Sequence, residues 1–440
     1  MPKYSILMPT RNRASLLNWA LETAISIDYD DFEIVVSDNN STDNTKEIYE
    51  KYAKRCDKIR YINPGKDLDM CSHWEFISNA ANGDYLLYLS DDDAIPSNLL
   101  KLLDKHIEFS GGNPIVWRPT WYNHPDVPDK QPDNMYNLDL RSTKQFIIPS
   151  EILVKAFFNF EKSVRGFFPV MLNSLIKREL FLKAKQKTGT FFMSPFPDYS
   201  AACHLLGICP YILYVDLPYY IAGASYISNA GMIYNRKKKF EDYISLFGEE
   251  IGKDVIYPMR YLINTYFAKT LLIFSNLYPS VFGKFKINNV IYLTALYKEL
   301  QLFKPYEDIS SEEKDLANYM KIETGNEMLF LGLMNENKTV KNNLISKIKP
   351  LVLGNVWLHR LMRFVQKFMP PPTKYSYAYS ATTTVHSKVK NIVEASKILT
   401  KYLEKFRFTN PISNDKFKPI DMTDCKDFEE LMIKMASRMK

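Results

Sequence analysis

Three adjacent aspartates carry the clearest chemistry in the sequence. Residues 84–93 read Asp-Tyr-Leu-Leu-Tyr-Leu-Ser-Asp-Asp-Asp, so an apolar strand pattern runs directly into Asp91, Asp92 and Asp93. Neighbouring carboxylates repel one another and are costly to desolvate, so such a cluster is either solvated or neutralised by a cation. Alternation along an extended backbone predicts Asp91 and Asp93 on one side and Asp92 on the other. Two carboxylates on one side can bind Mg²⁺ or Mn²⁺ and leave positions for phosphate oxygens, which suits a diphosphate substrate.

The elements that must position this cluster alternate between strands and helices. We expect strands at 4–8, 33–37, 58–62 and 85–89, and helices at 14–27, 42–53 and 73–81. Such alternation predicts right-handed crossovers and a mainly parallel α/β sheet flanked by helices. Ligands of such sheets bind beyond the carboxyl ends of the strands. Residues 37–40, Ser-Asp-Asn-Asn, and the three aspartates both belong to that edge.

The rest of the chain divides by composition. Residues 111–145 are rich in Pro, Asn and Asp, which predicts loops and edge strands, and helical periodicity dominates from about residue 235. We predict four parts in chain order: a first domain over 1–235, a helical region over 236–343, a basic amphipathic segment with a proline-rich stop over 344–372, and a C-terminal helical tail over 373–440.

The segment 344–372 leaves two interpretations open. Apolar residues such as Trp357 and Phe364 recur at helical spacing, while Arg360 and Arg363 share another face. A basic helix with Trp and Phe can lie in a membrane interface, and the same pattern also suits a helix packed on the protein's own core. The helical half would then dock the protein on a membrane, on a lipid-linked molecule or on another copy of itself as a homo-oligomer.

Composition excludes several classes of protein. The chain has 440 residues and 46% hydrophobic content, which predicts a globular protein with a substantial core. Its five cysteines are scattered without a CxxC pair, which predicts no zinc site and no disulfide framework. Reduced cysteines are typical of a cytoplasmic protein, and the protein would lie at the inner face of the cytoplasmic membrane if the amphipathic segment binds lipid. The apolar stretch 261–274 is too short to span a membrane. The formal charge of +7 is modest; we expect an anionic surface as partner of the basic C-terminal half, and no nucleic acid.

A second acidic segment follows the second expected strand. Ser41 or Thr42 would cap the next helix and leave Asp38 free at the strand end, although a plain capped turn explains the same residues. A calcium loop is excluded, because Asp43 stands at the sixth position, which needs Gly, and Tyr49 at the twelfth, which needs Glu.

Four segments in this order resemble family 2 glycosyltransferases with the GT-A fold. They are Ser-Ile-Leu-Met-Pro-Thr-Arg-Asn-Arg at 5–13, Glu-Ile-Val-Val-Ser-Asp-Asn-Asn-Ser-Thr-Asp-Asn-Thr at 33–45, Ala-Asn-Gly-Asp-Tyr at 81–85 and Leu-Ser-Asp-Asp-Asp at 89–93. The resemblance covers about residues 3–225. It implies a metal-dependent, inverting glycosyltransferase that moves a sugar from a UDP-linked donor to a glycan or lipid-linked acceptor in bacterial surface polysaccharide synthesis.

The resemblance also implies roles for individual residues. The nucleotide-sugar would be bound by residues of the first two loops and of the acidic cluster: Pro9, Thr10, Asn12, Arg13, Asp38, Asn40, Asp69, Asp91 and Asp92. Asp38 would accept a hydrogen bond from the base, and Asp93 would coordinate Mn²⁺ or Mg²⁺ on the donor diphosphate. Ser90 stands where similar enzymes carry a first acid, so the division of tasks between Asp91 and Asp92 stays open.

The general base of such enzymes comes from an acid about 100 residues beyond the metal motif, at the start of a helix. Asp198 matches by position, and its alternative is a helix cap after Pro197. Residues 219–225 lack the Arg-x-x-His-x-x-Ser pattern that similar enzymes often carry. The basic run 236–239 would either close over the diphosphate or be a solvated charged segment. Three aromatic residues would either stack on sugar rings or belong to the core: Trp117, Trp121 and Tyr122.

Two other functions fit the sequence less well than a glycosyltransferase. A non-catalytic nucleotide-sugar or carbohydrate-binding module with a decayed site would not need all three aspartates together with Asp198. A nucleotidyltransferase usually needs a glycine-rich phosphate loop, and the segment after the first expected strand contains no Gly.

Overall fold

The computed structural model describes residues 1–125, 133–139, 142, 144–194, 196–225, 257, 262–304, 308–325, 384–404 and 418–439. The predicted amphipathic segment 344–372 and the basic run 236–239 lie outside the described residues, as does much of the predicted helical region 236–343. Among the described residues, no helix is both long and apolar enough to cross a membrane.

The strands are β1 Tyr4–Thr10, β2 Phe32–Asp38, β3 Ile59–Ile62, β4 Tyr85–Tyr88, β5 Ile115–Trp117, β6 Thr120–Asn123, β7 Met135–Asp139, β8 Gln145–Pro149, β9 Ser174–Lys177, β10 Tyr211–Val215, β11 Ile221–Ala224, β12 Thr384–Lys388 and β13 Ile420–Asp421. The α-helices are α1 Ala14–Ala24, α2 Thr45–Ala53, α3 Met70–Asn79, α4 Leu99–Ser110, α5 Ser150–Phe158, α6 Arg178–Thr188, α7 Pro197–Ile208, α10 Ile263–Leu277, α11 Asn289–Leu300, α12 Ser310–Thr324, α17 Ile392–Glu404 and α18 Phe428–Met439.

The described strands form two sheets. The larger has the order β13-β8-β10-β5-β9-β4-β1-β2-β3, and the smaller has the order β11-β6-β7-β12. β1 pairs in parallel with β2 and β4, and β2 pairs in parallel with β3, so the ends of these strands meet at one edge. β9 runs antiparallel between β4 and β5. The small sheet adjoins the large one after β4, where Ala94 and Ile221 form an isolated bridge.

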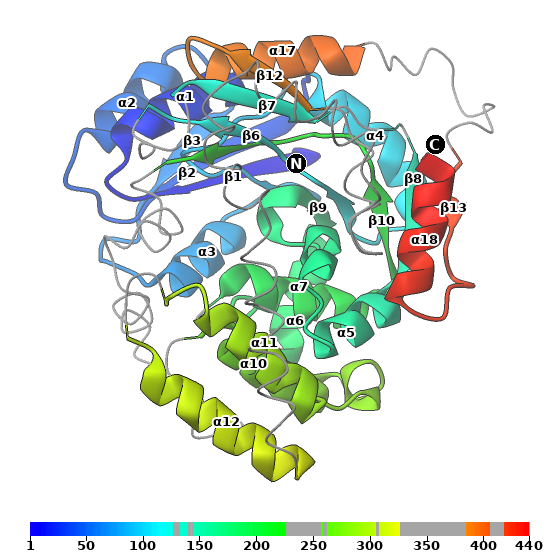
Figure 1. The fold of residues 1–440 in the computed structure, drawn as a ribbon. Helices are drawn as coiled ribbons and strands as arrows, with labels where there is room; N and C mark the ends of the chain where they lie inside the picture. Colours follow the sequence, from blue (N-terminus) through cyan, green and yellow to red (C-terminus); the bar gives the residue numbers. More distant parts are fainter. Residues whose placement is uncertain are drawn as a thin grey trace.

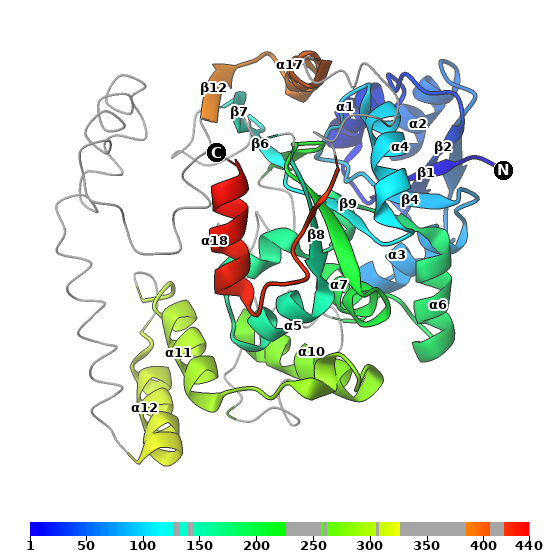
Figure 2. The ribbon, with the colours of Figure 1, turned by 90° about the vertical axis from the view of Figure 1, so that its right-hand side faces the viewer.

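Helices cover both faces of the large sheet (Figure 1). Alternate residues of the central strands explain this, since Ile6 and Ile34 face α1, α4 and α17, whereas Leu7 and Val35 face α3, α6 and α7. Helix α4 ends at Gly111, whose φ of 57° is left-handed and typical of a helix C-terminus. A further apolar cluster joins α5, α7, α10, α11, α12 and α18, and Figure 2 shows α10, α11 and α12 below the strands and α18 beside β8.

The C-terminal elements are packed onto the first domain. β12 pairs antiparallel with β7, and β13 pairs in parallel with β8. Helix α17 shares an apolar cluster with α1 and α4, and α18 shares one with α5. The described parts of the predicted tail 373–440 therefore add strands to both sheets, which a purely helical tail would not do. The predicted domain boundaries stay a prediction.

The predicted fold class is confirmed. A mainly parallel sheet is flanked by helices and followed by a mostly helical region, as expected for a GT-A type fold. The four predicted strands match β1 to β4 within two residues at each end.

Candidate functional site

The loops after β1 and β2 brace one another at the sheet edge. Thr10 and Asp38 are register partners at the ends of these strands. The Asn12 backbone N–H donates to Ser41 Oγ over 2.9 Å, and the Thr42 N–H donates to Asn12 Oδ1 over 2.7 Å. Asn12 has a left-handed φ of 53°, which asparagine tolerates better than most residues. The predicted capping by Ser41 or Thr42 is wrong, because both residues are engaged with Asn12 and the helix begins later.

Asp38 is buried rather than free at the strand end. Its Oδ1 accepts the Ser41 N–H over 2.9 Å, and its Oδ2 accepts the Tyr61 hydroxyl over 2.6 Å. Beneath it, Ser37 Oγ lies 2.8 Å from His73 Nε2, and burial lowers the pKa of His73 to about 4. The imidazole is therefore neutral near pH 7 and is part of the support of this edge.

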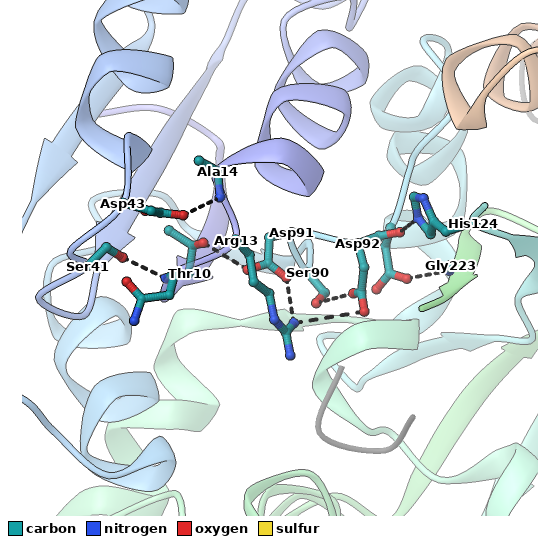
Figure 3. A network of polar contacts seen from close by, with 12 residues as sticks. Thr10, Arg13, Ala14, Ser41, Asp43, Ser90, Asp91, Asp92, His124 and Gly223 are labelled. Carbon is teal, nitrogen blue, oxygen red and sulfur yellow. Dashed lines mark hydrogen bonds and ion pairs between the residues drawn. The ribbon is translucent and has the colours of Figure 1, made fainter. Parts of the chain in front are cut away.

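Asp91 and Arg13 form the buried centre of the site (Figure 3). Arg13 Nη1 lies 2.8 Å from Asp91 Oδ1, and Thr10 Oγ1 donates to Asp91 Oδ2 over 2.8 Å. The Arg13 and Asp91 side chains are 17% and 4% exposed, so little water screens this ion pair. Burial raises the pKa of Asp91 above its ordinary value, while Arg13 acts in the opposite direction. A protein cation thus already stabilises negative charge here.

Asp92 points toward the same guanidinium. Its Oδ2 lies 3.9 Å from Arg13 Nη1, which is an ion pair without a hydrogen bond, and its Oδ1 accepts from Ser90 Oγ over 2.6 Å. The Asp92 carbonyl oxygen lies 2.8 Å from His124 Nε2. Asp91 and Asp92 therefore share Arg13, and Figure 3 shows both carboxylates on the side of its guanidinium.

Asp93 is directed away from that pair. Its Oδ1 accepts the Gly223 N–H over 2.7 Å, and its Oδ2 accepts the Tyr220 hydroxyl. The predicted side-by-side placement of Asp91 and Asp93 is wrong, because β4 ends at Tyr88 and the aspartates lie in a turn closed by the Asp93 N–H to Ser90 O contact of 3.2 Å. Burial, with Asp92 next, raises the pKa of Asp93 well above its ordinary value. Both carboxylate oxygens of Asp93 accept hydrogen bonds from Tyr220 and Gly223, on the side away from Arg13, and its predicted role as metal ligand stays a prediction.

The donor set at this edge fits a metal that arrives with a diphosphate. Among the described residues, no group of three or more His, Cys, Asp or Glu side chains could hold a metal ion alone. Mg²⁺ commonly takes only one or two carboxylates and completes its shell with water and substrate phosphates. Asp91 and Asp92 supply two carboxylates on one side, and Arg13 supplies a further positive charge.

Asp198 lies in the first turn of α7, but it does not cap the helix. The residue before the helix is Phe196, and no side chain caps this helix end. Asp198 Oδ1 is a buried oxygen with no hydrogen-bond partner among the described residues. Burial raises the pKa of Asp198 to about 7, although the Met171 backbone N–H donates to the carboxylate and opposes this. Burial and then the charges of Glu75 and Asp198 raise the pKa of Tyr88, so Asp198 lies near the end of β4.

The remaining predicted residues lie at the rim of the edge. Pro9 is half-buried on β1 opposite Ser37. Asn40, with a left-handed φ of 57°, donates from Nδ2 to Asp67 Oδ1 over 3.0 Å. Asp69 is exposed and caps α3, since its Oδ1 accepts the N–H of Ser72 over 3.0 Å.

Three residues at the acidic cluster were not predicted: His124, Tyr220 and Gly223. They lie in or directly beside β6 and β11 of the small sheet; Tyr220 and Gly223 are 127 and 130 residues from Asp93, and His124 is 32 residues from Asp92. A Cβ on Gly223 would lie 1.8 Å from the Asp92 carbonyl oxygen, so this position needs glycine for close approach. In the sequence, the presence of glycine at position 223 within a short strand pattern could have indicated this close approach of two backbone segments.

Known proteins similar to this chain are glycosyltransferases. Residues 5–182 match the model of glycosyl transferase family 2. A Campylobacter jejuni protein named GalNAc(5)-diNAcBac-PP-undecaprenol beta-1,3-glucosyltransferase is 36% identical over 104 residues, which are 23% of this chain and 34% of that protein. The Streptococcus pneumoniae glycosyltransferase GlyG is 22% identical over 192 residues, 43% of this chain and 61% of its own. The Staphylococcus aureus poly(ribitol-phosphate) beta-N-acetylglucosaminyltransferase TarS is 30% identical over 118 residues, 24% of this chain and 20% of its own.

The solved structure of residues 1–349 of S. aureus TarS with UDP-GlcNAc aligns with 94% of this chain and 95% of that chain, at 15% identity and a TM-score of 0.44. The chain spans 34% to 61% of the length of the first three curated relatives it matches. Residues 5–182, which contain the Thr10–Arg13–Asp91 network at the sheet edge, are a glycosyl transferase family 2 region.

Proposed function

We propose that the protein is an inverting glycosyltransferase that takes a sugar from a UDP-linked donor and is assisted by Mn²⁺ or Mg²⁺. The observation that carries the proposal is the convergence of Asp91, Asp92 and Arg13 at the ends of parallel strands. A nucleotide diphosphate needs both a cation and hydrogen-bonding groups at such an edge. The match of residues 5–182 to glycosyl transferase family 2 favours the same function.

The donor is bound in this proposal by residues of the first two loops and the acidic turn. Asp38 accepts a hydrogen bond from the base through a lone pair that Ser41 and Tyr61 leave available. Arg13 shifts from the two aspartates toward the diphosphate when the donor enters. In this proposal, Asp92 binds the metal ion instead of Asp93. Asp91, beside Asp92, contacts the ribose or the sugar of the donor. The divalent ion, when bound, supplies positive charge that offsets the charge of the leaving UDP.

Asp198 is the general base of the proposed reaction. It removes the proton from an acceptor hydroxyl while that oxygen forms a bond to the anomeric carbon. The bond from this carbon to the diphosphate oxygen breaks, UDP leaves with the electron pair, and the configuration inverts. A carboxyl with a pKa of about 7 is matched to this task, because half of it is ionised near neutral pH and it remains a useful proton acceptor.

We propose a glycan or lipid-linked acceptor in bacterial surface polysaccharide synthesis. The name of the C. jejuni relative, which contains PP-undecaprenol, supports a lipid-linked acceptor, and that of TarS supports a surface polymer. A cytoplasmic location at the inner face of the membrane, with peripheral contact through 344–372, belongs to the same proposal.

The test is a screen of nucleotide-sugars with and without Mn²⁺, read as release of UDP or another nucleoside diphosphate. We expect hydrolysis of at least one UDP-sugar that depends on the metal and is lost in Asp92→Ala. Binding of the nucleotide-sugar without any turnover, under all metals tested, would instead indicate a non-catalytic binding module.

A further inference from the structure

The outer face of the small sheet carries one exposed aromatic ring in polar surroundings. Of the three aromatics that the sequence offered for sugar stacking, Trp117 is 0% and Tyr122 1% exposed, so both belong to the core. Trp121 on β6 is 52% exposed. An indole offers a flat apolar face that suits the C–H face of a sugar ring.

The register of the sheet defines which residues share this face. Trp121 is paired with Ala222 on β11 and with Asn137 on β7, and Asn137 is paired with His386 on β12. Tyr122 and Tyr136 point the other way and join the apolar cluster that contains α17. Trp121 therefore lies on the face opposite α17.

The surroundings of Trp121 are polar and pre-ordered. His386 Nδ1 lies 2.5 Å from Asn137 Oδ1, and Thr384 Oγ1 donates to Asp139 Oδ1 over 2.7 Å on the same face. The small sheet has one other exposed large hydrophobic residue among those described, Val385, which alternation places on the opposite face. A protein partner would favour several exposed apolar side chains, whereas one ring beside hydroxyl, amide and carboxylate groups suits a carbohydrate.

The two strands that carry this face also reach the acidic cluster. His124, three residues beyond Trp121, lies on the Tyr122 face and contacts the Asp92 carbonyl oxygen over 2.8 Å. Along β11, Tyr220 stands two residues before the paired Ala222 and donates its hydroxyl to Asp93. One residue beyond the paired Ala222, the Gly223 N–H donates to Asp93. At about 3.3 Å per strand residue, Trp121 lies roughly 10 Å from the acidic turn. An oligosaccharide acceptor spans such a separation, but a single sugar does not.

We infer that Trp121, with the Asn137–His386 pair, forms a subsite for a distal sugar of an oligosaccharide acceptor. The inference rests on the proposed glycosyltransferase function and adds the substrate class, namely an acceptor longer than one sugar. The C-terminal strand β12 takes part in it, since His386 comes from this strand.

The probe is a panel of soluble tagged oligosaccharides of hexose and N-acetylhexosamine units, titrated onto the full-length protein with UDP and Mn²⁺ present. Wild-type protein should bind at least one member of the panel. Trp121→Ala should lose about tenfold or more in affinity for it, and Trp121→Phe should retain part of the affinity. The matched control is Trp19→Ala, since Trp19 is 38% exposed on α1 and should leave binding unchanged.

UDP-sugar hydrolysis in the same preparations separates this inference from the proposed function. Trp121→Ala should hydrolyse the donor at the wild-type rate, which also shows that the variant folds. Equal saccharide affinity in wild type and Trp121→Ala, or no saccharide binding by wild type, would overturn the subsite. Absence of donor hydrolysis by the wild type would instead count against the proposed function.

Discussion

The replacement Asp198→Asn tests the proposed general base at the residue itself. It removes the proton acceptor but keeps the size of the side chain. General-base removal typically costs 10²–10⁴-fold, so we expect transfer to fall by about that factor while UDP binding stays unchanged. The exposed Asp57→Asn is the matched control and should leave transfer unchanged.

The pH profile of the wild type should carry the signature of the same residue. With a pKa of about 7, Asp198 is about one tenth ionised at pH 6 and about nine tenths at pH 8. The ratio of kcat to KM should therefore rise about tenfold between these values and level off. Steady-state transfer in a constant ionic-strength buffer measures it. A flat profile, or an Asp198→Asn variant as active as wild type, would refute the assignment.

Stability should change with pH in the opposite sense. The folded-state pKa of Asp198 lies above its ordinary value of 3.8, so the folded protein holds a proton that the unfolded chain has lost between about pH 4 and 7. Its contribution to stability is thus present at low pH and disappears as pH rises through about 7. The free energy of unfolding should fall by at most about 4 kcal/mol between low and high pH, and by less than this limit because the side chain keeps some contact with water. Asp198→Asn should accordingly be more stable than wild type at pH 8, by chemical denaturation, and about equal at pH 4; a variant that is less stable than wild type at pH 8 would contradict this.

Three further substitutions address the support of the acidic turn. Gly223→Ala puts a Cβ at 1.8 Å from the Asp92 carbonyl oxygen, so the donor KM should rise at least about tenfold, and a normal KM in steady-state assays would contradict this. Ser396→Ala removes a buried hydrogen bond of 2.7 Å to Ile95 O, just after the aspartates, and should cost about 1–2 kcal/mol in urea denaturation; an unchanged midpoint would speak against this brace. Arg13→Gln leaves the carboxylates without their cation and should cost about 3 kcal/mol of stability at pH 7, which a wild-type melting curve would disprove.

The sequence predicted the strands of the sheet edge well because their pattern is local. Apolar runs such as 33–37 end in polar residues, and parallel strands place those ends together whatever the rest of the chain does. The family resemblance assigned Thr10, Arg13 and Asp91 to one site, and the parallel strand topology explains why they converge. Asp198 was found through family resemblance and position, and its buried oxygen adds a physical reason to keep it as the candidate base.

The errors came from contacts between distant segments. Alternation misplaced Asp93, because the aspartates lie in a turn and Tyr220 and Gly223 from β11 and its preceding loop draw the carboxylate away. Ser41 was expected to cap a helix, but Asn12 engages it instead. The strand β12 had no local signal, since its pairing with β7 joins residues about 250 positions apart. Edge pairing of this kind depends on the assembled sheet.

The central claim is that Asp91, Asp92 and Arg13 bind a nucleoside diphosphate together with a divalent ion. Calorimetric titration of UDP into the full-length protein, with Mn²⁺ and with EDTA, measures this most directly. We expect binding at least about tenfold tighter with Mn²⁺, a gain that is lost in Asp92→Asn and kept in Trp19→Ala. UDP binding that is equal with and without metal, or unchanged by Asp92→Asn, would contradict the claim.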